Sequence, residues 1–334
     1  MLRMVPARTG TVPRSTPPRE SPDYTFARMS RLRTFQLILL LLALLSGCSS
    51  QPVLTSAKLP QGAAAHQQDL LPSLEPNPDL FKFLAPSNDR DWAADQAVLA
   101  FADFQGQQVT VHNIRRITYR TATDFSVEYR DQTYDLDRLE SVDFIVVPFN
   151  ATPDMAHTML SFGFSDGQYL GVSVEIRKER GESFNPLKGF LRQYELMYVV
   201  ADEQELILRR VLFDLCDVYV YRTRAKPAEA RALFCDVMRR VNKLADRPEF
   251  YDTLTNNCTT NIRNHINRLA PDRVPYDYRV LLPGNSDKLA YDLGLLATDA
   301  PFAETRRAAR VNYLAYFYRD DPEFSQRIRQ QAAY

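Results

Sequence analysis

The sequence predicts an α+β domain in which an antiparallel sheet packs on helices, preceded by a signal segment and a flexible stalk. Short β-rich runs separated by turn residues fill much of the region 109–221. Two of these runs flank Asp166-Gly167, which is a hairpin signal because glycine accepts positive φ. An amphipathic helical pattern follows at 227–245. The predicted strands come first along the chain and the predicted helices follow them, and this segregation favours the α+β class.

The N-terminal region has the features of a bacterial lipoprotein signal. Arg31 and Arg33 precede the apolar run 37–45, which ends in small residues before Cys48. The run is shorter than the roughly 20 apolar residues that span a bilayer. Leu45-Ser46-Gly47-Cys48 resembles a lipobox, which implies cleavage before Cys48 and a lipid on its sulfur. The alternatives are an uncleaved anchor and an ordinary signal with an incidental cysteine.

The composition divides the chain into segments and predicts its location. Ser49, directly after the lipidated cysteine, resembles the pattern that directs lipoproteins to the outer membrane, so we expect the domain to face the periplasm. Pro, Gln, Ala and Ser dominate the stalk. The expected segments are an upstream extension at 1–28 before a true start at Met29, a signal peptide at 29–47, a lipidated stalk at 48–85, a folded domain at 86–298 and a helical extension at 299–334.

Charge and cysteine content exclude some classes of partner. The chain has 41 basic and 41 acidic residues, and this balance gives no reason to expect a nucleic-acid partner. No metal or organic cofactor is implied, and the acidic run 202–205 is expected to be solvated loop charge. Cys48 aside, three cysteines remain, so at least one thiol is free within the chain.

Periodicity assigns the elements of the folded domain. Pro227 suits the first turn of the clearest helix, and Pro248 lies just beyond its end. Strands are expected at 109–111, 114–119, 126–134, 142–147, 157–164, 169–176, 195–200 and 217–221, and helices at 227–245, 258–269, 287–293 and 303–318.

Cys258 is the candidate nucleophile. Asn256 or Asn257 can cap a helix that begins at Cys258, where the helix dipole favours the thiolate. The backbone N–H groups of the same turn can serve as an oxyanion hole. Cys258 shares the apolar face of its helix with residues such as Ile262, as an inert buried cysteine also would. Tyr251 can wall the site or simply pack.

His157 is the candidate base. His66 lies in the stalk, and His112 neighbours a turn without an evident partner. His265 is seven residues along the helix from Cys258, roughly 10 Å away, which is too far for direct proton transfer. His157 begins a strand of the central hairpin and can lie beneath the head of the cysteine helix.

The hairpin proposes an orienting residue, Glu175. A three-residue loop at 165–167 sets His157 across from Glu175. A two-residue loop at Asp166-Gly167 places Ile176 there instead and turns Glu175 to the other face. We favour the first register because it aligns a carboxylate with the imidazole.

Four short runs together carry a family resemblance: HTMLSFGF at 157–164, SVEIRKE at 173–179, YEL at 194–196 and NNCTT at 256–260. They resemble the N-terminal periplasmic domain of the Lnb lipoprotein N-acylation family over roughly residues 105–298. The order of His strand and Cys helix is similar to that of the circularly permuted NlpC-type, papain-like group, which includes lecithin:retinol acyltransferase. The resemblance implies that Cys258 is the nucleophile and His157 the base.

These features predict a membrane-tethered thiol acyltransferase or acyl-hydrolase that acts on lipids or lipoproteins through a thioester. The Lnb proteins couple this domain to a membrane-embedded part. No long apolar run follows residue 298 here, so two alternatives stay open: a lipid on Cys48 replaces the membrane-embedded part, or the substrate differs. Two alternatives stay open: a cysteine peptidase or amidase acting on cell-wall peptides, with a polar cleft, and an envelope scaffold in which Cys258 and His157 do not meet. The lipid-active enzyme predicts an apolar groove leading to Cys258.

Overall fold

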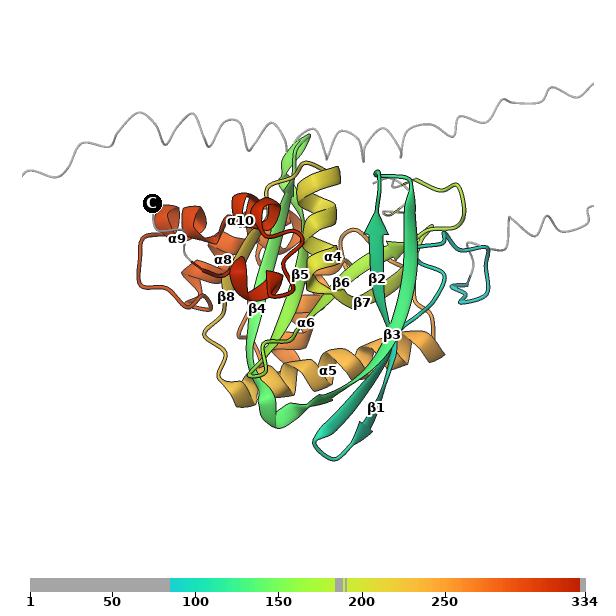
Figure 1. Ribbon diagram of the computed structural model, residues 1–334, viewed down its shortest axis with the longest axis horizontal. Helices are drawn as coiled ribbons and strands as arrows, with labels where there is room; N and C mark the ends of the chain where they lie inside the picture. The colour runs from blue at the N-terminus through green and yellow to red at the C-terminus, as the bar shows by residue number, and fades with distance from the viewer. Residues whose placement is uncertain (1–84, 184–188, 190, 331–334) are drawn as a thin grey trace, which may run out of the picture. The chain divides into compact units, whose positions relative to one another are not determined.

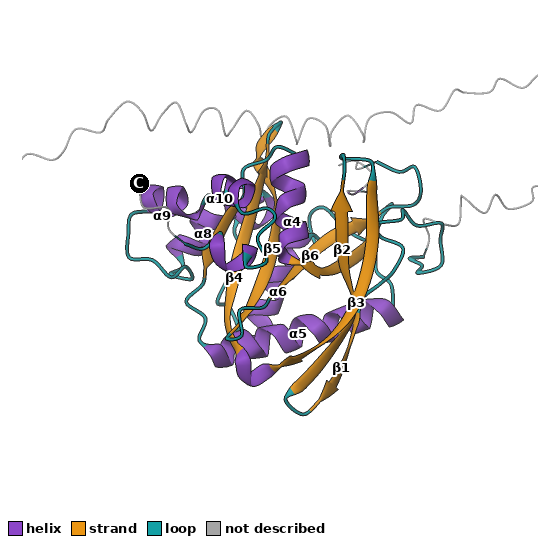
Figure 2. Ribbon diagram, in the orientation of Figure 1, coloured by secondary structure: helices purple, strands orange, loops and turns teal. Residues whose placement is uncertain are grey.

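A computed structural model describes residues 85–183, 189 and 191–330. An eight-stranded sheet lies between two groups of helices (Figures 1 and 2). The expected signal, Cys48 and the stalk up to residue 84 lie outside the described residues. Every helix within the described residues is too short or too polar to cross a lipid bilayer.

The strands follow the predicted runs closely. The two runs at 109–111 and 114–119 join into one strand at a bulge, where Asn113 adopts a φ of 58°. The first strand, Phe101–Gln105, was not predicted. The strands are β1 (Phe101–Gln105), β2 (Gln108–Tyr119), β3 (Phe125–Asp135), β4 (Leu139–Phe149), β5 (Thr152–Phe164), β6 (Tyr169–Arg177), β7 (Glu195–Asp202) and β8 (Tyr219–Arg222).

The sheet is mixed, which corrects the predicted antiparallel sheet. Its order is β1-β2-β7-β6-β5-β4-β8, with β3 paired to β2. All neighbours are antiparallel except β2 and β7, which pair in parallel at Arg115 and Ala201. The sequence pattern of a strand does not specify its neighbour, so this long-range pairing had no local signal.

Three of the four predicted helices are present, as α5, α6 and α8. Pro227 occupies the first turn of α5, and the backbone N–H of Lys226 donates to the Glu229 carboxylate at 2.7 Å. The helices are α4 (Glu203–Leu208), α5 (Pro227–Asp246), α6 (Cys258–Leu269), α7 (Tyr278–Leu281), α8 (Ser286–Asp292), α9 (Phe302–Ala309), α10 (Asn312–Phe317) and α11 (Phe324–Arg327). Short irregular helices are η1 (Leu136–Arg138), η2 (Arg209–Phe213) and η3 (Pro283–Asn285), of which η2 is a π-helix.

Two of the predicted elements need correction. The helix expected at 303–318 is broken, because Arg310 and Val311 pair with the backbone around β8. The acidic run 202–205 is not solvated loop charge: Glu203 and Glu205 are buried in α4. Glu205 pairs with Arg115 at 2.7 Å, and Glu203 pairs with Arg329 from the C-terminal segment. Carboxylates out of contact with water need such partners.

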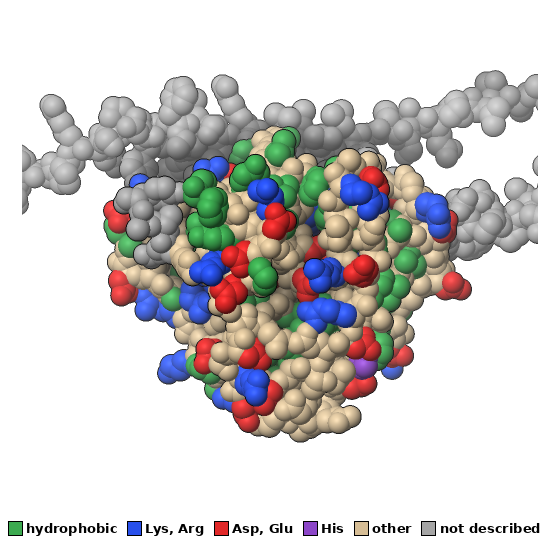
Figure 3. Space-filling view, viewed as in Figure 1, with side chains coloured by type: hydrophobic (Ala, Val, Ile, Leu, Met, Phe, Trp, Pro, Cys, Tyr) green, Lys and Arg blue, Asp and Glu red, His purple; other side chains and the backbone are tan. Residues whose placement is uncertain are grey.

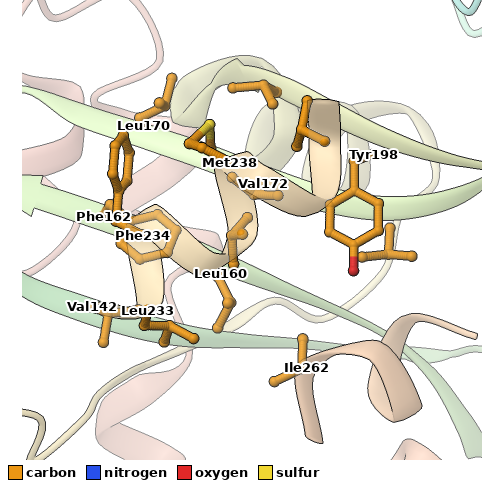
Figure 4. Close-up of a cluster of buried hydrophobic side chains, with 14 of the residues drawn as sticks. Val142, Leu160, Phe162, Leu170, Val172, Tyr198, Leu233, Phe234, Met238 and Ile262 are labelled. Atoms are coloured by element: carbon orange, nitrogen blue, oxygen red, sulfur yellow. The ribbon is translucent and has the colours of Figure 1, made fainter. Parts of the chain in front are cut away.

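Alternation along β5 divides the interior into two cores. Leu160 points toward α5 and α6, where Phe234 meets Phe162 edge to face with ring centroids 5.2 Å apart (Figure 4). Met159 points to the other face, where Phe324 and Ile328 from the last turns cover it. The C-terminal segment therefore contributes to the second core.

The surface carries both charges in close alternation. On the face of Figure 3, Lys and Arg side chains lie beside Asp and Glu side chains. This mixture agrees with the zero formal net charge of the whole chain.

The first core sets the stability of the domain. Phe234→Ala removes a fully buried ring from three aromatic neighbours, and we expect the free energy of unfolding to fall by about 3–5 kcal/mol. Phe317→Ala is the matched control, because Phe317 is 64% exposed on α10, and it should cost about 0.5 kcal/mol. Urea unfolding followed by circular dichroism measures both. Equal losses would contradict this assignment of the core.

Candidate active site

The Cys258 helix begins where the sequence predicts. Asn257 is the N-cap of α6, and its side chain accepts a hydrogen bond from the Thr260 backbone N–H at 2.8 Å. The Asn257 N–H donates in return to the Thr260 hydroxyl at 2.8 Å, which completes a reciprocal cap. Cys258 is thus the first helical residue, in the turn where free N–H groups favour an anion.

Amide side chains fix the loop before Cys258. The Asn256 amide donates to the Phe250 carbonyl at 2.8 Å, and the Asn257 amide donates to the Thr253 carbonyl at 2.6 Å. Asn261, one turn along α6, donates to the Asn256 side chain at 2.9 Å. Both predicted asparagines therefore hold the shape of the loop that places the thiol.

The structure brings His157 to Cys258. The Cys258 side chain is buried, and burial alone would raise the pKa of the thiol. A hydrogen bond with His157 and the charge of its imidazole outweigh burial, with further hydrogen bonds from Thr158, and lower the thiol pKa to about 7. The thiolate is therefore accessible near neutral pH.

The predicted register of the hairpin is correct. Phe164 and Gln168 close a three-residue loop, in which Gly167 has a φ of +83°. The β5–β6 ladder runs from Gly163–Tyr169 to Met159–Ser173. Continued by two residues, this register sets His157 across from Glu175.

A serine connects the histidine to the carboxylate. His157 Nε2 lies 2.6 Å from the Ser173 hydroxyl, which donates to Glu175 Oε1 at 2.8 Å. The direct distance from Nε2 to Oε1 is 3.7 Å, so Glu175 acts on His157 mainly through Ser173 and by its charge. If Ser173 donates to Glu175, its oxygen accepts from Nε2–H, and in that tautomer of the neutral imidazole Nδ1 is the acceptor nitrogen.

A half-buried arginine keeps Glu175 ionised. Arg210 Nη2, from the π-helix η2, donates to Glu175 Oε1 at 2.9 Å. Burial opposes ionisation, but Arg210, His157 and Arg115 together hold the pKa of Glu175 well below its usual range. A permanent negative charge thus faces the imidazole.

Sequence reasoning missed Ser173 and Arg210. Ser173 had a usable signal, because it lies two residues before Glu175 and shares its face of the strand. Arg210 had none, because it comes from a helix that packs on the sheet from a distant part of the chain.

Three other residues were considered from the sequence. Tyr251 lies near Cys258, whereas His265 and His112 have partners elsewhere. Burial and the charge of Cys258 raise the pKa of the Tyr251 hydroxyl well above its usual range, and Tyr251 packs against the core cluster that includes Cys258. His265 contacts the Tyr198 hydroxyl at 2.8 Å and Asp236 at 2.6 Å, and burial lowers its pKa to about 4. His112 lies between two aspartates on β1 and β3.

An apolar cavity of about 560 Å³ is lined by residues of α5 and α6, among them Thr259, the residue after Cys258. Its buried end is walled by Leu160, Thr259 and Ile262, and its exposed end lies between the start of α5 and the end of α6. Thr259 Oγ1 is 3.8 Å from the Cys258 sulfur. Figure 4 shows Leu160 and Ile262 among the buried side chains of the first core, and both residues also line this cavity.

In the part of the chain that the structure describes, no three His, Cys, Asp or Glu side chains are grouped as a metal site requires. Cys216, Cys235 and Cys258 are all free thiols.

Comparison with known proteins supports the family resemblance. Residues 125–284 match the family described as the Lnb N-terminal periplasmic domain. This segment runs from β3 to η3 and contains His157, Ser173, Glu175 and Cys258. Neither the curated proteins nor the solved structures gave a match. Residues 125–284 thus match the family that the sequence motifs resemble, the Lnb N-terminal periplasmic domain family.

Proposed function

We propose that this protein is a membrane-tethered cysteine acyltransferase or acyl-hydrolase that works through a thioester on Cys258. The observation that carries the proposal is the buried Cys258 thiol at a helix N-terminus, hydrogen-bonded to His157 with its pKa lowered to about 7. A buried cysteine without a base has a raised pKa, as Cys216 does.

The first half of the reaction forms the thioester. His157 Nδ1 takes the thiol proton, and the Cys258 sulfur attacks the carbonyl carbon of an acyl donor. Backbone N–H groups at the start of α6 stabilise the oxyanion that forms. The new C–S bond is completed as the bond from the carbonyl carbon to the leaving group breaks, and the imidazolium protonates that group.

The second half releases the acyl group. An amine, an alcohol or water attacks the thioester carbon, and His157 takes the proton from the attacking atom. The C–S bond breaks and the Cys258 thiolate leaves. Glu175, held ionised by Arg210, stabilises the imidazolium through Ser173 in both halves.

The apolar cavity favours an acyl substrate over a peptide. A peptide presents an amide in every residue, and each buried amide needs a hydrogen-bond partner. The cavity walls beside Thr259 are side chains such as Leu160, Ile262 and Leu233. For the same reason we propose lipids or lipoproteins as substrates. The lipobox before Cys48 and the following Ser49 lead us to propose that a lipid on Cys48 holds the protein at the outer membrane.

The proposal predicts covalent labelling by an activated acyl ester. We expect the label on Cys258 in the wild type and at least a roughly 100-fold slower reaction in His157→Ala, since general-base catalysis contributes about 10²–10⁴-fold. Mass spectrometry of the peptides locates the label. Cys216 and Cys235 are internal controls. If Cys258 reacts no faster than they do, and His157→Ala makes no difference, the scaffold alternative leads.

The pH dependence of alkylation tests the thiol–imidazole pair separately. The rate of Cys258 alkylation by iodoacetamide should rise with pH to half its maximum near pH 7. In His157→Ala burial is no longer opposed by the imidazole, so the midpoint moves to higher pH. Glu175→Gln should move it the same way but less, because the imidazolium loses a negative neighbour. Glu140→Gln, which neutralises an exposed carboxylate on β4, should leave the midpoint in place.

Lipid anchoring predicts a change of fraction. Cys48→Ser removes the sulfur that would carry the lipid, and the protein should move from the membrane fraction to the soluble periplasmic fraction. Cys216→Ser is the matched control and should stay with the membranes. Mass spectrometry of the N-terminal peptide should find the lipid on Cys48. A protein that stays on the membrane after Cys48→Ser would be held there by something else.

A further inference from the structure

We propose that α10 carries a membrane-contact surface that inserts into the headgroup region of a phospholipid bilayer. The surface, which we call the α10 patch, consists of Leu215, Tyr313, Tyr316 and Phe317. This inference goes beyond the proposed function, because it needs no chemistry at Cys258. α10 also lies beyond residues 125–284, so the match to the Lnb domain family does not include it.

The aromatic part of the patch is one exposed side of α10. Tyr313, Tyr316 and Phe317 are 62%, 58% and 64% exposed, and their spacing of i, i+3 and i+4 puts them on one side of the helix. Tyr313 stacks with Phe317 at a ring-centroid distance of 6.2 Å. The opposite side carries Ala315, which is buried in the second core. Figure 3 shows hydrophobic side chains gathered over α10. The helix is therefore apolar on both sides, although one side faces solvent.

A strained leucine extends the patch. Leu215 is 73% exposed and has a φ of 53°, a left-handed conformation that is costly for a bulky residue. Its carbonyl accepts a hydrogen bond from the Asn150 amide at 3.1 Å. The carbonyl of the next residue, Cys216, accepts one at 2.8 Å from Asn312, the first residue of α10. Backbone strain is thus tolerated where it keeps a leucine side chain at the surface beside α10, which points to a role there.

The chemistry of the patch fits a membrane interface. Tyrosine combines an apolar ring with a hydroxyl, and such side chains are enriched at the level of the lipid headgroups. Arg319 lies over the Tyr316 ring, 4.8 Å from its centroid, and a guanidinium pairs well with phosphate. The basic residues near the patch have acidic partners, since Arg310 pairs with Asp217 and Arg319 with Asp320. Burial of the rings, rather than attraction to anionic lipid, therefore drives the contact.

The size of the patch favours a bilayer over a protein partner. An aromatic side chain offers about 150–250 Å², so three rings that are about 60% exposed offer roughly 270–450 Å², and Leu215 adds less than another ring. A stable protein interface takes about 800 Å² from each partner.

A small contact is sufficient on a membrane to which the protein is already tethered, because the tether raises the effective concentration. Residues 49–84 separate Cys48 from the described domain, and they span at most about 130 Å. The proposed lipid on Cys48 would keep α10 within that reach of the bilayer.

Quenching by brominated lipid tests the contact on the lipidated full chain, carried on phosphatidylcholine vesicles. Phe317→Trp places a fluorescent probe in the patch, and wild type gives the background, because its single tryptophan, Trp92, is buried. Interfacial side chains sit about 5–10 Å into the headgroup boundary, so lipid brominated near the top of its acyl chains should quench Phe317→Trp strongly. Tyr276→Trp is the matched control and should be quenched no more than wild type. Tyr276 is 69% exposed and lies over Arg263 of α6, on the other face of the sheet.

Removing the other two rings should release the domain from the bilayer. Burial of one ring contributes at least about tenfold in affinity, so Tyr313→Ser with Tyr316→Ser should shift the ratio of bound to released Phe317→Trp domains at least about tenfold. Tyr276→Ser in the same background should leave the ratio unchanged. Raising the salt concentration should also leave it unchanged, because the charges around the patch are paired. Circular dichroism checks that each variant is folded.

The outcomes separate this proposal from the others. If bromine quenches neither probe, or quenches both equally, the α10 patch is not a membrane contact. A blue shift of Phe317→Trp emission that grows with protein concentration in the absence of vesicles would show that a second copy covers the patch instead. If the chain carries no lipid, an N-terminal histidine tag on nickel-chelating vesicles replaces the tether, and the same two probes decide the patch. The thiol chemistry at Cys258 is unaffected by any of these results.

Discussion

The site depends on one interaction, the hydrogen bond between His157 and a thiol that burial would otherwise keep protonated. A buried thiolate is costly, so its partner has to be close and correctly oriented. Two local features meet this requirement. The reciprocal Asn257–Thr260 cap sets where α6 begins, and the three-residue hairpin loop sets which face of β5 carries His157. A shift of one residue in either would separate the thiol from the base.

A second group of polar residues, separate from His157, Ser173 and Glu175, also holds α6 in position. His265 joins Asp236 on α5 to the Tyr198 hydroxyl on β7, and Tyr198 donates to the Asn261 side chain at 3.0 Å. Asn261 in turn donates to the Asn257 carbonyl at 2.8 Å, at the head of the helix. His265 is too far from Cys258 for direct proton transfer, and its hydrogen bonds instead help to hold α6 in position.

Local patterns predicted the parts of this site that are local. The cap at Asn257, the first-turn position of Cys258 and the register that sets His157 across from Glu175 all follow from short stretches of sequence. Contacts between distant segments were not predictable in this way. Arg210 reaches Glu175 from η2, and β2 runs parallel to β7, because tertiary packing places them together. The burial of Glu203 was missed for the same reason, since its partner Arg329 is 126 residues away.

The two faces of the sheet explain how one thiol can have both a charged and an apolar neighbourhood. Ser173, the residue paired with Met159, belongs with Arg210 to the layer of α4 and η2, whereas Leu160 faces α5, α6 and the cavity. His157 and Thr158 lie just beyond the last β5–β6 pair, at Met159 and Ser173. The head of α6 meets the sheet at this point, so the thiol contacts both residues. The charged residues Arg210 and Glu175 lie on one face of the sheet, and the apolar residues such as Leu160 lie on the other. The apolar face therefore does not desolvate those charges further.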